Sequence, residues 1–226
     1  NWSFKNWGSI TSINFSSFGD IKMGSKNSHG YNGWGLTNFY SENTNSFYKS
    51  TPTLNPDPLI QKNTGYNQID LFQKFRFKFS SQNYLSINLQ LSNSSNINRY
   101  DKLSEVRDGN LRFAQWYYGP QKRFLFSPKF EFFKGSRLLK SGVITLAYQD
   151  IKESRVNRKF ESFDKNHQSE RVSILSLNAD FSAKPSNEIN TSYGVEIIQN
   201  IISSDAHSSE LSVSENQILN YVNRIP

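Results

Sequence analysis

The sequence predicts an all-β fold in which antiparallel strands form a transmembrane up-and-down β-barrel. Three observations support this prediction. Several segments alternate apolar and polar residues, the connections between them are alternately short and long, and aromatic residues make up 15% of a polar chain. In barrels of this class, every second residue faces lipid, short turns lie on the periplasmic side and long loops lie outside the cell.

The alternation is clearest over residues 69–79. Its apolar set is Ile69, Leu71, Phe75, Phe77 and Phe79, and its polar set is Asp70, Lys74, Arg76 and Lys78. Only Phe72 and Gln73 break the pattern, which restarts over residues 84–93. A period of two places the two sets on opposite faces of a strand, so we expect two strands joined by a short turn.

The same reading gives about seven strands along the chain. In order, they cover roughly residues 3–18, 66–79, 84–93, 121–133, 141–152, 171–182 and 188–199. The long outer loops then cover about 19–65, 94–120, 153–170 and 200–226, and the short periplasmic turns about 80–83, 134–140 and 183–187. Strands of around ten residues match a tilted bilayer span. Because Pro128 cannot donate to a strand ladder, we expect a bulge or local break there.

Aromatic residues should mark one border of the lipid-facing surface. If residues 69–79 descend toward a periplasmic turn, Phe75, Phe77 and Phe79 lie low on the lipid face. Phe130 and Phe132 reach the same depth on the next descending strand. The alternative is that these rings form the core of a soluble sandwich.

Composition excludes several other classes of protein. With a mean hydropathy of −0.65 and no long apolar run, the 226-residue chain contains no candidate transmembrane helix. The absence of cysteine excludes a disulfide-stapled secreted module. The net charge of +7 arises from scattered Lys and Arg without a nucleic-acid motif, so no nucleic-acid partner is expected. Because the chain begins at Asn1 and ends at Pro226 within an expected loop, we interpret it as a fragment of a longer protein.

Several segments, taken in order, resemble the barrel of a known family. They are FGDIKMG (18–24), HGY (29–31), GYNQID (65–70), NRYDKL (98–103), RDGNLR (107–112), AQWYYGPQKR (114–123) and AYQDIKESR (147–155). Together they resemble TonB-dependent outer-membrane receptors, in particular the large receptors with an N-terminal carboxypeptidase-regulatory-like domain. The resemblance covers nearly the whole chain.

The resemblance implies an importer in the outer membrane of a Gram-negative bacterium. Such a receptor captures a scarce ligand at its outer loops and admits it when the TonB–ExbB–ExbD complex displaces the plug. Receptors of this kind close with about 22 strands around a plugged lumen. Residues 1–226 would then be a partial barrel domain without the plug. The implied partners are the protein's own plug domain, the remaining barrel strands, outer-membrane lipid and lipopolysaccharide, and a surface lipoprotein or larger outer-membrane complex.

The sequence offers little support for enzyme chemistry. The three histidines, His29, His167 and His207, fall in separate expected loops without an acidic partner at ligand spacing. The glycine-rich run 30–35 neither follows a strand nor opens a helix, so it does not predict a phosphate site. We therefore expect no catalytic residues, no metal site and no cofactor.

The expected outer loops hold aromatic and arginine side chains suited to binding a ligand. These candidates are Tyr31, Trp34, Tyr40, Tyr48, Arg99, Tyr100, Arg107, Arg112, Trp116, Tyr117 and Tyr118. A structural interpretation competes with this one. Residues 116–118 could form the outer aromatic belt, and the other residues could pack the loops on themselves.

Charged residues on the polar side of the strands should face the lumen or the plug. They are Asp70, Lys74, Arg76, Lys78, Arg123, Lys129 and Glu131. Contact with a plug of opposite charge is the more common role, and an anion path is the alternative.

Two other functions remain open from the sequence. The barrel could be a scaffold in a larger outer-membrane assembly, with its long loops holding partner proteins. The chain could also be a soluble β-sandwich that binds carbohydrate through loop aromatics. Solubility without detergent separates the sandwich from the barrel, and stoichiometric partners without an uptake role separate the scaffold from the receptor.

Overall fold

The computed structural model describes the chain except for residues 27–29, 32, 134, 213–219 and 225–226. Its main feature is an 11-stranded sheet whose path runs β1-β2-β7-β8-β13-β14-β15-β16-β17. The strands on this path are β1 (Trp2–Ser3), β2 (Trp7–Phe18), β7 (Tyr66–Lys78), β8 (Asn83–Ser94), β13 (Lys122–Phe132), β14 (Ser141–Lys159), β15 (Asp164–Ala183), β16 (Thr191–Ser212) and β17 (Asn220–Arg224). Every pairing on this path is antiparallel. The all-β antiparallel prediction is therefore confirmed.

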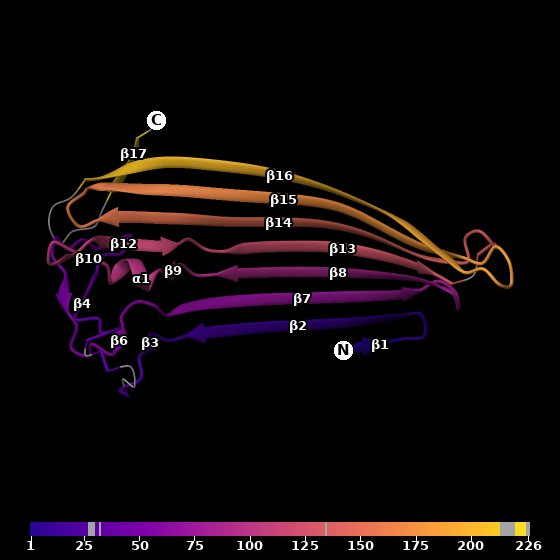
Figure 1. Ribbon diagram of the computed structural model, residues 1–226, viewed down its shortest axis with the longest axis horizontal. Coiled ribbons are helices and arrows are strands. Elements are labelled where there is room, and N and C mark those ends of the chain that lie inside the picture. The colour runs from indigo at the N-terminus through magenta and orange to yellow at the C-terminus, as the bar shows by residue number, and fades with distance from the viewer. Residues whose placement is uncertain (27–29, 32, 134, 213–219, 225–226) are drawn as a thin grey trace.

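The short elements lie within the long connections. They are β3 (Ile21–Lys22), β4 (Phe39–Tyr40), β5 (Thr53–Leu54), β6 (Ile60–Gln61), β9 (Ile97–Asn98), α1 (Tyr100–Leu103), β10 (Val106–Arg107), β11 (Asn110–Leu111) and β12 (Phe113–Tyr118). Most of them gather at one end of the sheet, on the left in Figure 1, whereas the short turns lie at the other end. The long strands lie in a single layer (Figure 1), so the described strands do not form the two stacked sheets that the sandwich alternative requires.

Strand register defines two faces of this sheet. Phe75 is paired with Ser9 on one side and Ile87 on the other, and Ile87 is paired with Pro128. Because side chains alternate along a strand, the predicted apolar residues of β7 share one face with those of β8 and β13. We call this side the apolar face. It continues across β14, β15 and β16 through Leu146, Leu177 and Ile197.

The opposite side is the polar face. It carries the seven charged residues predicted to share one side of the strands: Asp70, Lys74, Arg76, Lys78, Arg123, Lys129 and Glu131. The sequence pattern was sufficient to assign these faces because one side of each strand is consistently apolar.

The last three long strands extend much further than the alternation indicates. Residues 153–170, expected to be a long loop, are strand except for the connection 160–163. Except for Val156, side chains in this part of the two strands are polar on both faces, so the period of two disappears while backbone pairing continues. Residues 200–212 likewise extend β16, and residues 113–118 of another expected loop form β12.

Pro128 leaves the strand register unchanged. β13 pairs with β8 through Pro128 and Ile87 without a shift. On the β14 side, the register before and after Pro128 is the same. The expected bulge is therefore absent, whereas the pairing with β14 is locally broken at residues 127–128, between the pairs Phe126–Tyr148 and Lys129–Thr145, because proline has no N–H to donate.

None of the helical segments in the described part of the chain has the length and apolar character needed to cross a bilayer.

Candidate ligand-binding site

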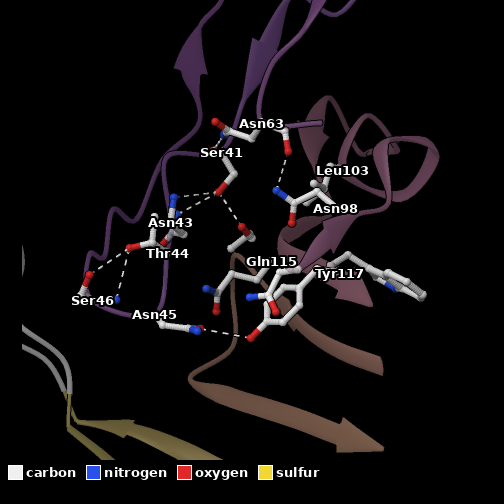
Figure 2. A pocket seen from close by; sticks show the side chains of 13 residues that line it. Ser41, Asn43, Thr44, Asn45, Ser46, Asn63, Asn98, Leu103, Gln115 and Tyr117 are labelled. Atoms are coloured by element: carbon white, nitrogen blue, oxygen red, sulfur yellow. Dashed lines mark hydrogen bonds between the residues drawn. The ribbon is translucent and has the colours of Figure 1, made fainter. Parts of the chain in front are cut away.

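A cavity of about 340 Å³ lies at the loop end of the sheet, between residues 41–46 and β12 (Figure 2). Eight lining residues are Asn, Ser or Thr: Ser41, Asn43, Thr44, Asn45, Ser46, Asn63, Asn96 and Asn98. Gln115, Tyr117, Trp116, Leu103 and Ala114 complete the lining. Every lining side chain is therefore neutral, although the chain carries a net charge of +7.

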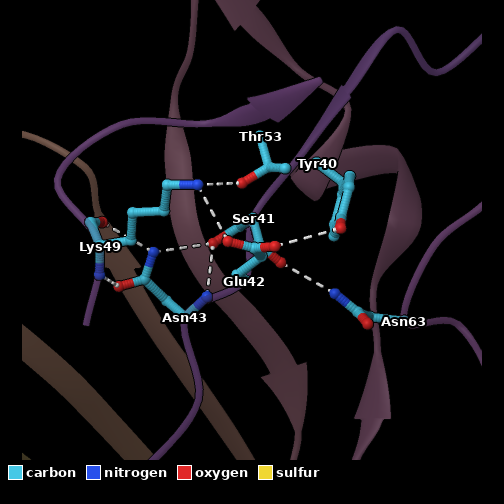
Figure 3. A network of polar contacts seen from close by, with 7 residues as sticks. All are labelled: Tyr40, Ser41, Glu42, Asn43, Lys49, Thr53 and Asn63. Carbon is cyan, nitrogen blue, oxygen red and sulfur yellow. Dashed lines mark hydrogen bonds and ion pairs between the residues drawn. The ribbon is translucent and has the colours of Figure 1, made fainter. Parts of the chain in front are cut away.

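Side-chain hydrogen bonds hold the segment 41–49 in a closed loop (Figure 3). Asn43 donates from Nδ2 to the Lys49 carbonyl at 3.0 Å, and its Oδ1 accepts from the Lys49 backbone N–H at 3.1 Å. The Ser41 hydroxyl donates to the Ala114 carbonyl of β12, and Asn63 donates to the Ser41 carbonyl at 2.8 Å. These contacts fix one wall of the cavity without any regular secondary structure.

Glu42 is the charged centre of the same loop. Lys49 Nζ donates to its carboxylate at 3.0 Å, and the Tyr40 hydroxyl donates to it at 3.2 Å (Figure 3). The hydrogen bond from Lys49 lowers the pKa of Glu42 below its usual value. Burial, together with the negative charge of Glu42, raises the pKa of Tyr40.

A buried polar cluster joins this loop to the sheet, and we call it the loop latch: Asn43, Asn45, Tyr48, Arg158 and Lys165. Arg158 and Lys165 are only 1% and 2% exposed. Arg158 donates from Nη2 to Asn43 Oδ1 at 2.7 Å and lies 5.2 Å above the Tyr48 ring. Lys165 Nζ donates to Asn45 Oδ1 at 2.7 Å. The latch thus fixes the loop onto β14 and β15 through neutral oxygens and an aromatic ring.

Lys165 makes the latch sensitive to pH. Burial, with Arg158 nearby, lowers the pKa of its amine to about 8. Between pH 8 and the ordinary lysine value the folded protein binds fewer protons than the unfolded chain, so this group makes the folded state more stable as the pH rises. We expect hydrogen exchange of residues 41–49 to slow over this interval, after correction for the intrinsic rate. In Lys165→Met, the corrected exchange rate of residues 41–49 should not change over this pH interval. A change that persists in this variant would show that another group causes the effect.

The predicted binding residues fall into three structural groups. Tyr48, Trp116 and Tyr117 are buried, at 8%, 6% and 8% exposure, and Trp116 and Tyr117 also line the cavity. Tyr31 and Trp34 are 71% and 65% exposed.

The third group consists of loop arginines and tyrosines held in local contacts. Arg99 donates to Asp101 at 2.8 Å and lies 4.8 Å above the Trp116 ring. Arg112 pairs with Glu105, and the hydrogen bond from Arg112, with a second from Lys102, lowers the pKa of that carboxyl.

The other members of this group, Tyr40, Tyr100, Arg107 and Tyr118, are half-buried or exposed. Tyr40 is half-buried beside Glu42, Tyr100 is 38% exposed at the start of α1, and Arg107 is exposed. Tyr118 accepts a 3.4 Å hydrogen bond at its hydroxyl from Arg99. The structure therefore brings only part of the predicted set to the cavity.

Sequence reasoning missed the asparagines and serines that dominate the cavity. They come from three separate stretches, around residues 41–46, 63 and 96–98, and the first and last of these contain short runs rich in Asn and Ser. Such runs normally indicate turns, so composition alone gives no reason to connect them. Loop contacts between distant segments bring them together.

On the polar face, opposite charges and hydroxyls contact the predicted lumen residues. Glu131 pairs with Arg76 at 3.3 Å and with Lys129 at 3.1 Å. Asp70 accepts a 2.6 Å hydrogen bond from Ser92. Arg123 donates to Gln149 at 2.9 Å.

Lys74 and Lys78 form no ion pair with any described residue. The described residues also contain no group of three His, Cys, Asp or Glu side chains positioned to hold a metal ion. The chemistry that this arrangement supports is recognition by neutral hydrogen-bonding groups in the cavity and by charge on the polar face.

Comparison of the chain with protein-family models, with curated proteins and with solved structures found no match.

Proposed function

We propose that this chain is part of the wall of a transmembrane β-barrel in the outer membrane of a Gram-negative bacterium. In this proposal the protein is a TonB-dependent receptor that captures a scarce ligand at its outer loops and imports it. The observation that carries the proposal is an uncovered apolar band on one face of a single-layer sheet. On β13 the band runs from Phe132 to Phe124, about 27 Å at roughly 3.4 Å per residue. That matches the roughly 25 Å apolar band of outer-membrane barrels.

Aromatic rings border this band on the side of the short turns. Phe132 of β13 and Phe181 of β15 meet across Gly142 of β14, and Tyr193 lies beside Phe181 on β16, with ring centroids 6.4 and 5.4 Å apart. Trp7 and Phe77 are paired at the corresponding end of β2 and β7. Rings at this depth are typical of the interfacial girdle of a barrel. The long loops with the neutral cavity lie at the opposite end, where the proposal places the cell exterior.

The edges of the sheet support the proposal that further strands belong to the same wall. β1 contacts β2 only at Gly8 and Ser9, and β17 contacts β16 only at residues 208–212. Most of each outer edge is therefore without a strand partner in the described part of the chain. In lipid such edges must be paired, which is why we include the remaining barrel strands among the partners.

The polar face supports a plugged lumen in the same proposal. Lys74 and Arg76 would contact a plug domain of opposite charge. We expect Lys74→Gln combined with Arg76→Gln to loosen the plug, measured as faster proteolysis of the plug in outer-membrane fractions. Unchanged plug retention with reduced anion uptake would favour an anion path instead.

Because the chain contains no cysteine, single introduced thiols can test the membrane topology. Leu146 is 47% exposed on the apolar face, and Thr145 is its neighbour on the opposite face. In outer membranes, Leu146→Cys should resist a charged maleimide and react with a lipid-soluble one. Thr145→Cys should not react with the lipid-soluble reagent. Arg155→Cys, beyond the apolar band, serves as the water-exposed control. Efficient reaction of Leu146→Cys with the charged reagent would contradict the proposal.

Transport is tested by genetic epistasis. Uptake of labelled siderophores, cobalamin, glycans and peptides is measured in strains lacking this protein, lacking TonB, or lacking both. We expect one ligand whose uptake fails equally in all three strains. Normal uptake of every ligand in the strain lacking this protein, with stoichiometric partners recovered on purification, would favour the scaffold function.

A further inference from the structure

We propose that the apolar face carries a site for the phosphate groups of an outer-leaflet lipid headgroup, formed by Lys122, Lys152 and Arg171. The inference rests on the proposed function and adds a named ligand chemistry to the lipid surface of the wall. The three side chains form a row of like charges, which a sheet does not favour by itself.

The three cations form a row across adjacent strands. Lys122 of β13 is directly paired with Lys152 of β14, which is directly paired with Arg171 of β15. Neighbouring strands lie about 4.8 Å apart, so the three side chains start close together on one face. All three residues are exposed. Like charges at directly opposite positions destabilise a sheet, so an isolated row of this kind carries a cost.

Nearby carboxylates offset only part of this charge. Asp150 lies two residues from Lys152 on the same face and accepts from Arg171 Nε at 2.7 Å and Nη2 at 2.9 Å. Asp205, the nearest carboxylate on that face of β16, contacts His207 at 3.0 Å. Neither Lys122 nor Lys152 forms an ion pair with a described residue. The row therefore retains positive charge, and an anionic ligand would relieve the repulsion.

The position of the row identifies the source of the anion. The next row on the same face toward the short turns is Phe124 on β13, Asp150 on β14 and Ser173 on β15, and the row beyond it, Phe126, Tyr148 and Leu175, belongs to the apolar band. A lipid whose acyl chains cover the band would place its headgroup at the level of the three cations. Asp150 fixes the Arg171 guanidinium through two nitrogens and leaves Nη1 for a phosphate oxygen, while the lysines supply flexible charges. Phosphate is the headgroup chemistry that this set matches.

The test uses the full-length protein purified in a neutral detergent. Binding to bisphosphorylated lipid A is compared with binding to the same lipid after enzymatic removal of its phosphates. We expect removal of the phosphates to weaken binding at least tenfold, and Lys122→Gln combined with Lys152→Gln to do the same. The matched control is Arg155→Gln with Lys159→Gln, which removes the same charge from exposed positions of β14 on the opposite face and should leave binding unchanged.

Each other outcome overturns the inference in a defined way. Equal binding of the dephosphorylated lipid, or an equal loss in both double variants, excludes a phosphate site at this row. Inorganic phosphate that binds as tightly as the lipid would assign the row to a free anion. Displacement of lipid by an acidic polypeptide but not by its neutral analogue, with no loss on dephosphorylation, would assign it to a protein partner. A wild-type protein that stays monodisperse without detergent would contradict the proposed function itself. A protein that inserts into membranes, and whose Lys122/Lys152 variant binds lipid as tightly as the wild type, would overturn only this inference.

Discussion

Replacing Arg158 with alanine is expected to release residues 41–49 from the sheet. The guanidinium is 1% exposed and donates to Asn43 Oδ1 at 2.7 Å and to the Ser162 carbonyl at 3.2 Å. Its removal leaves these acceptors without their charged donor and removes the contact with the Tyr48 ring. Hydrogen bonds from a charged group contribute about 1.5–3 kcal/mol each, so we expect the loop to open at least 30-fold more often.

Hydrogen exchange measures this opening segment by segment. Residues 41–49 should exchange faster in Arg158→Ala, while β7 and β8 should be unchanged. Arg155→Ala is the matched control, because Arg155 lies three residues away on the same strand and is exposed. Its guanidinium lies 6.0 Å from the centroid of the Tyr118 ring and does not contact residues 41–49 in any hydrogen bond or ion pair found among the described residues. If the two variants exchanged alike, the loop would be held by contacts other than the latch.

Gly142→Val is expected to produce the largest loss of stability within the apolar band. A Cβ atom at this position would lie 2.5 Å from Phe181 Cδ1 and 2.8 Å from Phe132 Cε1. The rings of β13 and β15 lie over the glycine, and Phe181 also contacts Tyr193. Overpacking a close-packed site costs about 1–3 kcal/mol, and displacement of both rings places the expected loss near the upper limit.

The measurement is the denaturant midpoint of the folded protein, with Gly142→Ala expected to give an intermediate value. Gly24→Val is the control, because no atom lies within 4 Å of its added Cβ position. A midpoint for Gly142→Val equal to that of Gly24→Val would show that the aromatic row adapts without cost. It would also remove the reason for a glycine at this end of the ladder.

Part of the candidate site could be found from the sequence, and part could not. Trp116 and Tyr117 were predicted as binding residues because they are aromatic and lie outside the alternating segments, and both line the cavity. Asn45 gives no comparable signal, yet it accepts hydrogen bonds from Tyr117 and Lys165. A contact between residues 120 positions apart depends on how a loop returns to the sheet, and local composition contains no record of that path.

The sequence by itself determined the long strands, the face of each side chain in the apolar band, and the positions of the short turns. It did so because one side of each strand is apolar over the length of the band, and a period of two records that difference. Only the tertiary structure decided that β14, β15 and β16 extend beyond the band, that Arg158 and Lys165 are buried, and that Lys122, Lys152 and Arg171 form one row. Backbone pairing and cross-strand register produce these features, and neither requires a side-chain periodicity that a sequence could display.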